Sequence, residues 1–262
     1  MNPTKSAVEP QTVQSLTRGL AVIRTFGVDK QRQSLAQVAE ATGLARATAR
    51  RFLHTLVAEG YAGTDGSQFW LTPKILELGY SYMSGLGLPA LAQPHLEELS
   101  RTVGESSSMS VLDRDEVVYV SRVPVRQIMT VSITIGTRLP AHNTSMGRVL
   151  LSGMSPEELD RYLASIEAEP YTTNTITNRE ELRQEIKKVG EQGYCIVDQE
   201  LEVGLRSLAA PIYSSDFRVI AAINISTQVA KYSLEDIHST FLPELLKTAE
   251  AISADVAAAQ LA

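Results

Sequence analysis

Residues 34–59 read SLAQVAEATGLARATARRFLHTLVAE and predict two short helices separated by a tight turn. Ser34 is a typical N-cap residue for the first helix, and Gly43 stands where a left-handed residue would end it. The second helix is expected from about Ala45 to Glu59, and it is rich in arginine. Two short helices divided by a glycine turn, the second of them basic, are typical of a helix-turn-helix.

Helical periodicity divides this second helix into two faces. The apolar face should pack against the rest of the domain and consists of Ala49, Phe52, Leu53 and Leu56. The opposite face is expected to meet DNA through Arg46, Ala47, Thr48, Arg50, Arg51 and His54. Arg50 and Arg51 carry the guanidinium fork that matches O6 and N7 of guanine, so we expect them to read bases. Arg46 and Thr48 lie in the first turn, where helices approach phosphates, and Ala47 is small enough to touch a thymine methyl.

Flanking patterns extend this motif to a winged helix-turn-helix domain over residues 15–72. Ser15 is expected to cap a helix whose apolar positions run from Leu16 to Phe26 at helical spacing. Behind the basic helix, two short strand-like runs are joined by Asp65-Gly66, a pair typical of a two-residue type I′ hairpin turn. Arginines on an exposed helix most often form only a solvated surface. Here, however, a predicted hairpin directly follows the basic helix, as the wing does in a winged helix-turn-helix. The combination favours DNA binding.

Composition separates a small basic module from a large acidic one. The 262 residues suffice for two domains, and the formal net charge is −6. Residues 1–72 hold eight Lys or Arg against five Asp or Glu, whereas the remainder holds sixteen against twenty-five. The overall charge argues against a chain that coats nucleic acid, but the basic N-terminal part is compatible with a local DNA contact.

The sequence gives no indication of secretion, membrane insertion, metal binding or a cofactor. A single cysteine, Cys195, cannot form an intrachain disulfide, so a reducing, cytoplasmic location is expected. Neither Cys195 nor the four histidines are spaced as metal ligands. Residues 1–14 are polar and are expected to be a disordered arm, and no apolar run is long enough to span a membrane.

The rest of the chain is predicted to be a linker helix and an α+β domain. Thr72-Pro73 is a typical helix start, and the linker is expected over residues 73–88. From residue 89 the expected elements are helix 89–103; strands 108–112, 116–123 and 128–135; helices 145–153, 155–165 and 179–191; strands 194–198, 206–213 and 218–227; and a closing helix 234–258. Strands that come in runs, rather than alternating singly with helices, indicate an α+β fold with antiparallel neighbours.

A signature in the second half identifies a family resemblance. The segments 193–200 (GYCIVDQE) and 204–212 (GLRSLAAPI) resemble IclR-type transcriptional regulators in spacing and residue type, and the likeness extends from Ser15 to the last helix. Val197 stands where the family usually has Asp or Ser, and Ser214 where it has Asp or Asn. The first departure matters because that acid can contact a small carboxylate effector in the family.

A second set of segments is similar to the regulators of protocatechuate and β-ketoadipate catabolism, the Pca/Pob subgroup. These segments are 132–136, 138–141 and 144–151. The resemblance implies a GAF-like effector domain over residues 89–262, a homodimer or homotetramer, a palindromic operator near a promoter, and an aromatic or dicarboxylic acid effector. Carried over by position, the effector-binding residues are Ser145, Met146, Gly147, Val197, Ser207, Asn224 and Ser226, with Leu139 and Leu205 as apolar wall.

The chemistry of this set suits a carboxylate. Backbone amides at the start of the helix from residue 145 can donate to an anion, and hydroxyl and amide side chains can add donors. Asn224 and Ser226 lie two residues apart on a strand and should share a face. Arg148 and Arg206 are second-rank candidates for the positive charge, with structural or interface roles preferred. His142 is expected to be a surface or capping group.

Three functions stay open on the sequence alone. The first is a ligand-responsive DNA-binding regulator of an aromatic-catabolism operon. The second is an enzyme acting on a small carboxylic acid with an accessory DNA-binding module, and the third is an architectural DNA-binding protein without an effector. The enzyme is disfavoured, and no catalytic residue is assigned, because the chain lacks a G-x-S-x-G elbow, a phosphate-binding loop and an H-E-x-x-H motif. Cys195 is expected to be buried and inert.

Overall fold

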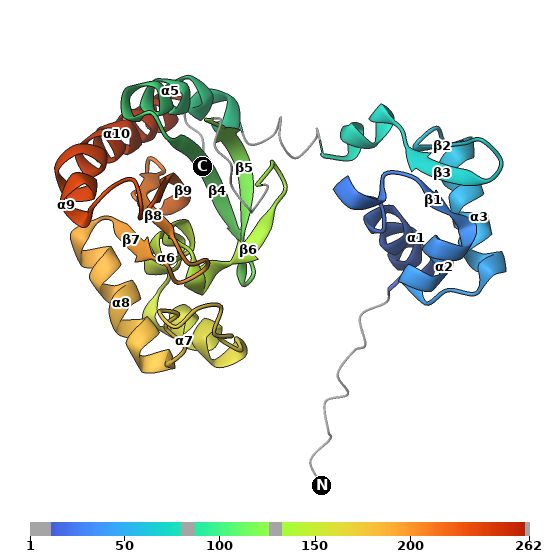
Figure 1. The fold of residues 1–262 in the computed structure, drawn as a ribbon, viewed down its shortest axis with the longest axis horizontal. Helices are drawn as coiled ribbons and strands as arrows, with labels where there is room; N and C mark the ends of the chain where they lie inside the picture. The colour runs from blue at the N-terminus through green and yellow to red at the C-terminus, as the bar shows by residue number, and fades with distance from the viewer. Residues whose placement is uncertain (1–11, 80–86, 126–132, 260–262) are drawn as a thin grey trace, which may run out of the picture. The chain divides into compact units, whose positions relative to one another are not determined.

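The computed structural model describes residues 12–79, 87–125 and 133–259. Its backbone contacts divide the chain into two compact units, residues 1–84 and 85–262, which are described separately (Figure 1).

The N-terminal unit is a three-helix domain with a small antiparallel sheet. Its helices are α1 (Gln14–Arg24), α2 (Leu35–Thr42) and α3 (Arg46–Ala58), with a 3-10 turn η1 (Val28–Lys30) after α1. Its strands, in the spatial order β1-β3-β2, are β1 (Gln33–Ser34), β2 (Ala62–Thr64) and β3 (Gln68–Leu71). The core consists of Val22, Val38, Leu53 and Phe69, one from each helix and one from the sheet. The predicted winged helix-turn-helix is confirmed.

Local chemistry explains the turn between α2 and α3. Ser34 accepts the Gln37 amide and the Gln37 side chain accepts the Ser34 amide at 2.8 Å, which makes a capping box. Gly43 ends α2 with a φ of 64° and Ala45 precedes the first residue of α3. The start of α2 at Ser34 and its end at Gly43 were both predicted correctly. The start of α1 was not, since Ser15 lies inside the helix and Val13 occupies the N-cap.

The wing differs from the predicted two-residue turn. Thr64 pairs with Phe69, so four residues form the loop, and of its members only Gly66 has a positive φ, at 93°. A type I′ turn needs positive φ at both central residues. Instead, Asp65 Oδ1 accepts the amides of Ser67 at 2.9 Å and Gln68 at 2.8 Å. The Asp65 side chain thus satisfies the loop amides, which favours the longer loop.

The C-terminal unit is built on one antiparallel sheet of six strands, in the order β6-β5-β4-β9-β8-β7. The strands are β4 (Ser106–Asp113), β5 (Glu116–Val123), β6 (Arg138–Pro140), β7 (Cys195–Asp198), β8 (Leu205–Tyr213) and β9 (Val219–Gln228). The helices are α5 (Leu88–Val103), α6 (Ser145–Ser152), α7 (Pro156–Ser165), α8 (Arg179–Gln192), α9 (Leu234–Asp236) and α10 (Leu242–Ala258), with a 3-10 turn η3 (Ala141–Asn143) before α6. This is the predicted α+β domain.

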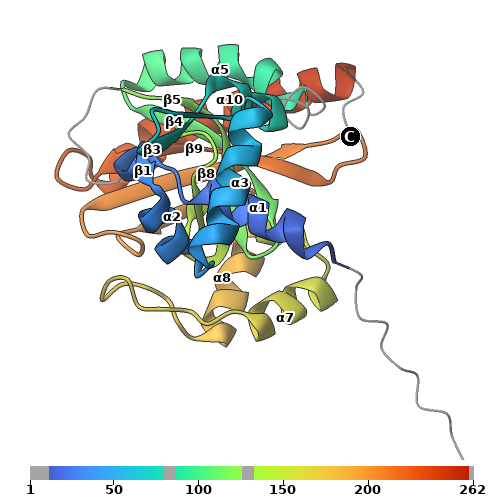
Figure 2. The same ribbon diagram turned by 90° about the vertical axis from the view of Figure 1, so that its right-hand side faces the viewer.

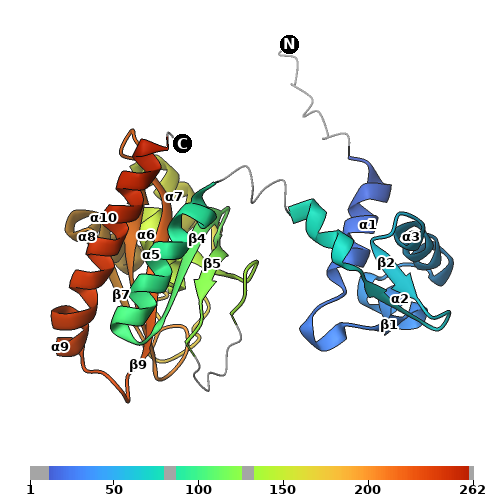
Figure 3. The same cartoon turned by 90° about the horizontal axis from the view of Figure 1, so that it is seen from above.

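Helices cover both faces of this sheet. Helices α5 and α10 lie side by side on one face (Figure 3), and α6 packs on the other, with α8 and α7 behind it. Figure 2 shows α5 and α10 above the sheet and α7 and α8 below it. The turn η3 and the start of α6 therefore face the middle strands β4, β9 and β8, where the candidate effector residues gather.

The third strand predicted for the C-terminal unit differs from the structure. Of the strand predicted at 128–135, residues 128–132 lie outside the described residues and 133–135 are not a strand; β6 pairs with β5 instead. The Thr134 carbonyl accepts the Thr137 amide at 3.0 Å across a turn containing Gly136, whose φ is 87°. Because of that turn, the strand begins only at Arg138.

The predicted linker and closing helices are interrupted. The linker begins with a 3-10 turn η2 (Pro73–Ile75) and is helical through residue 79, but residues 80–86 lie outside the described residues. The limits of 73–88 for this linker stay a prediction. The closing helix contains a π-helical turn, η4 (Ile237–Phe241), before α10. Pro243 follows this turn, and because proline has no N–H to continue the i→i−4 ladder, the regular pattern breaks there.

Candidate functional site

The DNA-binding face predicted on α3 is open to solvent. Arg46, Ala47, Arg50, Arg51 and His54 are exposed and Thr48 is half-buried, whereas Ala49 and Leu53 on the opposite side are fully buried. In the part of the chain that the structure describes, no hydrogen bond or ion pair engages the guanidinium groups of the three arginines. These cations are therefore available to phosphates and base edges.

The wing contacts two other parts of the same unit, the segment before β1 and helix α3. The Arg32 guanidinium lies 4.0 Å from the centre of the Trp70 ring and 3.4 Å from Asp65 Oδ2 at the hairpin tip. The His54 ring meets the ring of Phe69 edge to face at 5.8 Å. His54 therefore links the exposed face of α3 to the wing, in addition to its predicted DNA contact.

A buried pocket lies in the C-terminal unit between the sheet and the start of α6. Its lining residues are Tyr119, Ile133, Leu139, Asn143, Thr144, Ser145, Met146, Val197, Leu201, Leu205, Ser207, Asn224 and Ser226. Eight of the nine predicted effector residues are in this set, and Gly147 is the exception. Residues from distant parts of the chain, Tyr119 to Ser226, are thus brought to one cavity by the pairing of β8 with β9 and by α6 packing across them.

Gly147 has a packing role instead of lining the pocket. Its amide donates to the hydroxyl of the N-cap residue Thr144 at 3.1 Å, so this donor is already used. A Cβ at position 147 would lie 2.0 Å from the carbonyl oxygen of Ala141, far inside contact distance. Glycine is therefore required here for η3 to pack closely against α6.

The pocket presents donors at the N-terminus of α6. Ser145 and Met146 occupy the first helical positions, where amides have no acceptor within the helix, and the helix dipole favours negative charge there. The Ser145 hydroxyl lies 2.9 Å from the Ser207 hydroxyl on β8. Oxygen atoms of a ligand would find both amide and hydroxyl donors at this end of the pocket.

Two buried asparagines in the lining are incompletely paired. Asn143 is fully buried and Asn224 is 2% exposed. Among the described residues, neither atom of the Asn143 amide has a hydrogen-bond partner, nor has Oδ1 of Asn224, whose Nδ2 donates to Ser226 Oγ at 3.1 Å. A buried polar atom without a partner costs about 1–3 kcal/mol. A polar ligand that met these atoms would recover that cost.

The remaining wall is apolar and closes the pocket tightly. Ile133, Leu139, Leu201 and Leu205 are half-buried, and burial raises the pKa of Tyr119 to about 12. The cavity volume is about 30 Å³, far below the roughly 150 Å³ of an apolar cavity that admits benzene. A ring-containing acid must therefore displace lining side chains as it enters, and the half-buried ones have room to move outward.

Sequence reasoning missed five lining residues: Tyr119, Ile133, Asn143, Thr144 and Leu201. Asn143 and Thr144 come directly before Ser145, so their place at a helix start was a usable signal. Tyr119 carried only the alternation of a strand, which does not tell which face is toward α6.

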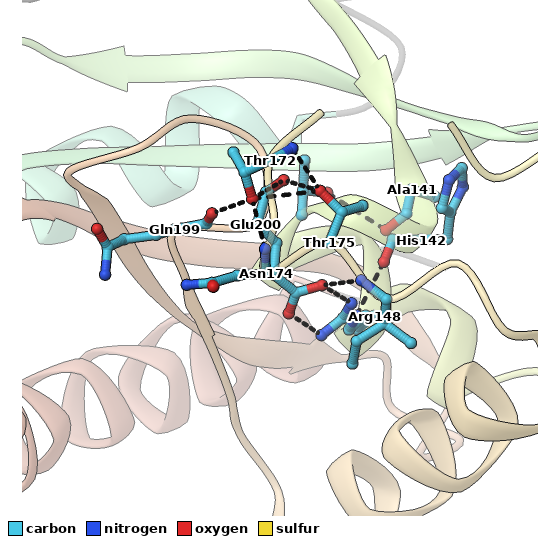
Figure 4. A network of polar contacts seen from close by, with 10 residues as sticks. Ala141, His142, Arg148, Thr172, Asn174, Thr175, Gln199 and Glu200 are labelled. Atoms are coloured by element: carbon cyan, nitrogen blue, oxygen red, sulfur yellow. Dashed lines mark hydrogen bonds and ion pairs between the residues drawn. The ribbon is translucent and has the colours of Figure 1, made fainter. Parts of the chain in front are cut away.

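The two second-rank arginines are fully engaged in structural ion pairs. Arg148 donates to both carboxylate oxygens of Glu200 at 2.7 and 2.6 Å and to the His142 carbonyl at 2.8 Å (Figure 4). Arg206 donates to both oxygens of Asp198 at 3.0 and 2.9 Å and to the Tyr232 carbonyl at 3.0 Å. The structural role preferred for both from the sequence agrees with these contacts.

The Arg148–Glu200 pair anchors a wider network. Figure 4 shows Thr172 and Thr175 reaching the backbone at Gln199 and Glu200; their hydroxyls donate to these carbonyls at 2.6 Å each. His142 was expected to be a surface or capping group, which is wrong: it is 5% exposed, Thr144 caps α6, and His142 Nδ1 lies 3.3 Å from the Tyr162 hydroxyl, with burial lowering the His142 pKa. The network holds the turn before α6 against the end of β7.

Cys195 is buried beside this network. Burial raises the pKa of its thiol to about 12. A thiol with so high a pKa holds almost no thiolate at neutral pH, in agreement with the expected inert role.

Comparison with known sequences decides the family. Residues 80–254 match the family described as bacterial transcriptional regulator IclR C-terminal, and residues 15–66 match the IclR helix-turn-helix domain. The chain belongs to the IclR family. It is a transcriptional regulator and not an enzyme, since its relatives in this family are transcriptional regulators.

Individual IclR-family proteins are similar over most of the chain. The Pca regulon regulatory protein of Pseudomonas putida is 42% identical over 91% of this chain and 82% of its own length. The p-hydroxybenzoate hydroxylase transcriptional activator of Acinetobacter baylyi is 37% identical over 90% of this chain and 89% of its own.

Solved structures of IclR-family proteins agree with the fold. A transcriptional regulator from Rhodococcus sp. RHA1 is 58% identical, with a TM-score of 0.87 over 95% of this chain and 100% of its own. An IclR homologue from Microbacterium hydrocarbonoxydans, solved with 4-hydroxybenzoate, is 25% identical, with a TM-score of 0.82 over 92% of this chain and 98% of its own.

No three or more His, Cys, Asp or Glu side chains among the described residues are grouped to hold a metal ion. None of the helices described is both long and apolar enough to cross a membrane.

Proposed function

We propose that this IclR-family regulator binds a small aromatic or dicarboxylic acid, of the protocatechuate or β-ketoadipate type, in the pocket beside α6. Binding would then control an aromatic-catabolism operon through the N-terminal domain. The observation that carries the proposal is a closed pocket with apolar walls in which Asn143 and Asn224 have unpartnered amide atoms.

The lining matches such a ligand group by group. Leucine and isoleucine side chains with Tyr119 offer flat, apolar contact to a ring or a methylene chain. The α6 amides, the serine hydroxyls and the two asparagines offer donors and acceptors to its oxygen atoms. Val197 adds a further apolar side chain to this wall.

The relatives support this choice of ligand. The names of the two curated relatives refer to the Pca regulon and to p-hydroxybenzoate hydroxylase, and the Microbacterium homologue was solved with 4-hydroxybenzoate. A hydroxylated benzoate has the ring and the polar groups that this pocket is lined to receive.

The DNA contacts are proposed on the exposed face of α3. Arg50 and Arg51 would read bases, with Arg46, Thr48, Ala47 and His54 contacting phosphates or groove walls. Two copies in a homodimer, or four in a tetramer, would read a palindromic operator because the symmetry of the protein is matched by that of the site. The regulator would act in the cytoplasm, beside the chromosome, where a lone buried cysteine stays reduced.

The ligand can change DNA binding only if it binds two forms of the regulator with different affinities. Because the closed cavity has little free volume, the ligand would favour a form with the outer wall displaced, and that form would bind DNA differently. Allosteric couplings are about 1–3 kcal/mol, which changes operator affinity about 5- to 150-fold.

Calorimetric titration of the full chain tests the proposal. The probes are 4-hydroxybenzoate, protocatechuate and β-ketoadipate, each at several temperatures, with D-glucose as an uncharged control. Saturable heat from one of the acids, with a negative heat-capacity change from buried apolar surface, is the expected result. Absence of heat from every acid at all temperatures would leave an architectural DNA-binding role and end the sensor proposal.

A further inference from the structure

A row of polar side chains crosses the sheet on the face that lines the pocket. In the register of β9, β4 and β5, Asn224 pairs with Ser108, and Ser108 pairs with Arg122. Directly paired residues on adjacent strands project from the same face. Ser110, two residues along β4, donates to the Met146 sulfur at 3.3 Å, which confirms that this is the α6 face. Arg122 therefore stands on the pocket face, in line with Asn224.

Arg122 does not line the cavity itself, but its contacts lie next to residues that do. Its Nη1 donates to the hydroxyl of Ser108, itself only 1% exposed, at 3.2 Å. Its charge also acts on the buried phenol of the lining residue Tyr119, partly opposing the effect of burial on the Tyr119 pKa. The guanidinium thus contacts Ser108, whose strand partner is the lining residue Asn224 on β9. It is also close enough to the lining residue Tyr119 on β5 to affect its pKa.

Arg122 differs from the other buried arginines of this unit in its partners. Arg148 and Arg206 each hold a carboxylate with two hydrogen bonds. Arg122 is half-buried, and among the described residues no carboxylate lies within ion-pair distance of it. Burial lowers its pKa, yet a guanidinium stays charged at neutral pH. Among the described residues the guanidinium has one neutral hydroxyl as its hydrogen-bond partner, so it keeps donors for a carboxylate, which is its best bidentate complement.

The span of the site fits one ring. Arg122 is on β5 and Ser207, which meets Ser145 at the start of α6, is on β8, with β4 and β9 between them. Strands lie about 4.8 Å apart, and Arg122 reaches one strand inward to Ser108, so about 10–14 Å separate the two sets of donors. This distance is about the length of a benzene ring that carries a polar group at each end, plus one hydrogen bond from each of those groups to the protein.

We propose that Arg122 binds the carboxylate of the effector, at the end of the pocket opposite the N-terminus of α6. The hydroxyl groups of a hydroxybenzoate, or the second carboxylate of a dicarboxylic acid, then lie toward Ser145 and Asn143. This inference rests on the proposed function and names the residue that makes the site select an anion over a neutral molecule of the same shape.

Binding of matched acids and esters tests the inference. Full-length protein is titrated by calorimetry with 4-hydroxybenzoate and with its methyl ester, and likewise with protocatechuate and its ester. The wild-type protein is expected to prefer each acid about 10- to 100-fold, the scale of a charge-assisted hydrogen bond. Arg122→Gln is expected to lose that preference, with ester binding changed less than about threefold.

Two further variants separate binding from folding. Arg122→Lys keeps the charge without the fork and should retain part of the preference for the acid. Arg114→Gln, at the exposed β4–β5 turn, is the matched control and should bind as the wild type does. A thermal unfolding curve accompanies each variant, and the acid-to-ester ratio of the wild-type protein requires no variant at all.

The outcomes are distinct. Acid binding by the wild type that is unchanged in Arg122→Gln overturns the role of Arg122 and leaves the sensor proposal standing. Equal affinity of the wild type for acid and ester also overturns it. Failure of the wild type to bind any of these acids or β-ketoadipate overturns both proposals.

Discussion

Replacement of Gly147 by alanine should destabilise the C-terminal unit strongly. The added Cβ would lie 2.0 Å from the Ala141 carbonyl oxygen, a backbone atom that cannot rotate away. Inserting atoms into a packed interior costs about 1–3 kcal/mol and occasionally more, and a backbone clash belongs at the upper end. At about 2–4 °C per kcal/mol for a unit of this size, Gly147→Ala should lower the melting temperature by about 6 °C or more.

Gly190→Ala is the matched control, measured in the same calorimetric scans. Its Cβ would lie 3.6 Å from the Ser152 Cβ, an ordinary contact, in the interior of α8. Removing glycine from a helix interior stabilises by about 0.5–1 kcal/mol, so this variant should melt slightly higher than the wild type. If Gly147→Ala melted within 1–2 °C of the wild type, the close packing of η3 on α6 would be refuted.

Three other substitutions test separate parts of the account. Glu200→Gln leaves the buried Arg148 guanidinium without a charge partner, so it should cost about 3–5 kcal/mol in urea unfolding, whereas Glu116→Gln at an exposed ion pair should cost at most about 1 kcal/mol; equal losses would contradict the burial of the first pair. Arg50→Ala should weaken binding to the cognate operator by about 1–3 kcal/mol and to random DNA little, measured by fluorescence anisotropy, and equal losses on both would make it a phosphate contact. Ser207→Leu should abolish the response to the acid and leave operator binding without the acid intact, while loss of both would indicate a folding defect.

Features set by local chemistry could be predicted from the sequence. The capping residue Ser34 and the left-handed Gly43 fix the turn of the helix-turn-helix within a few residues of chain. The Asp65-Gly66 pair by itself predicts a two-residue turn, which is wrong for this wing. The Asp65 carboxylate accepts two loop amides, and this favours a longer loop that residue preferences alone do not reveal.

Features set by sheet register could not be predicted. The β-branched run near residue 133 has strand character, yet β6 begins at Arg138 because the turn at Gly136 intervenes. The residue pattern along β5 does not distinguish Arg122 from a strand residue that faces solvent. Only its pairing with Ser108, and through it with Asn224, places it on the pocket face. Most of the lining was found through family resemblance, which carries this long-range information.

The most direct test of the central claim is the binding of a fluorescent duplex carrying the divergent promoter region next to this protein's own gene. Full-length protein is titrated with and without 4-hydroxybenzoate, protocatechuate and β-ketoadipate, at two salt concentrations and against a scrambled duplex. The account predicts salt-dependent, sequence-selective binding that one of these acids shifts about fivefold or more. Selective binding that no acid moves would contradict the sensor, and binding no tighter than to the scrambled duplex would contradict the placing of the operator at this promoter.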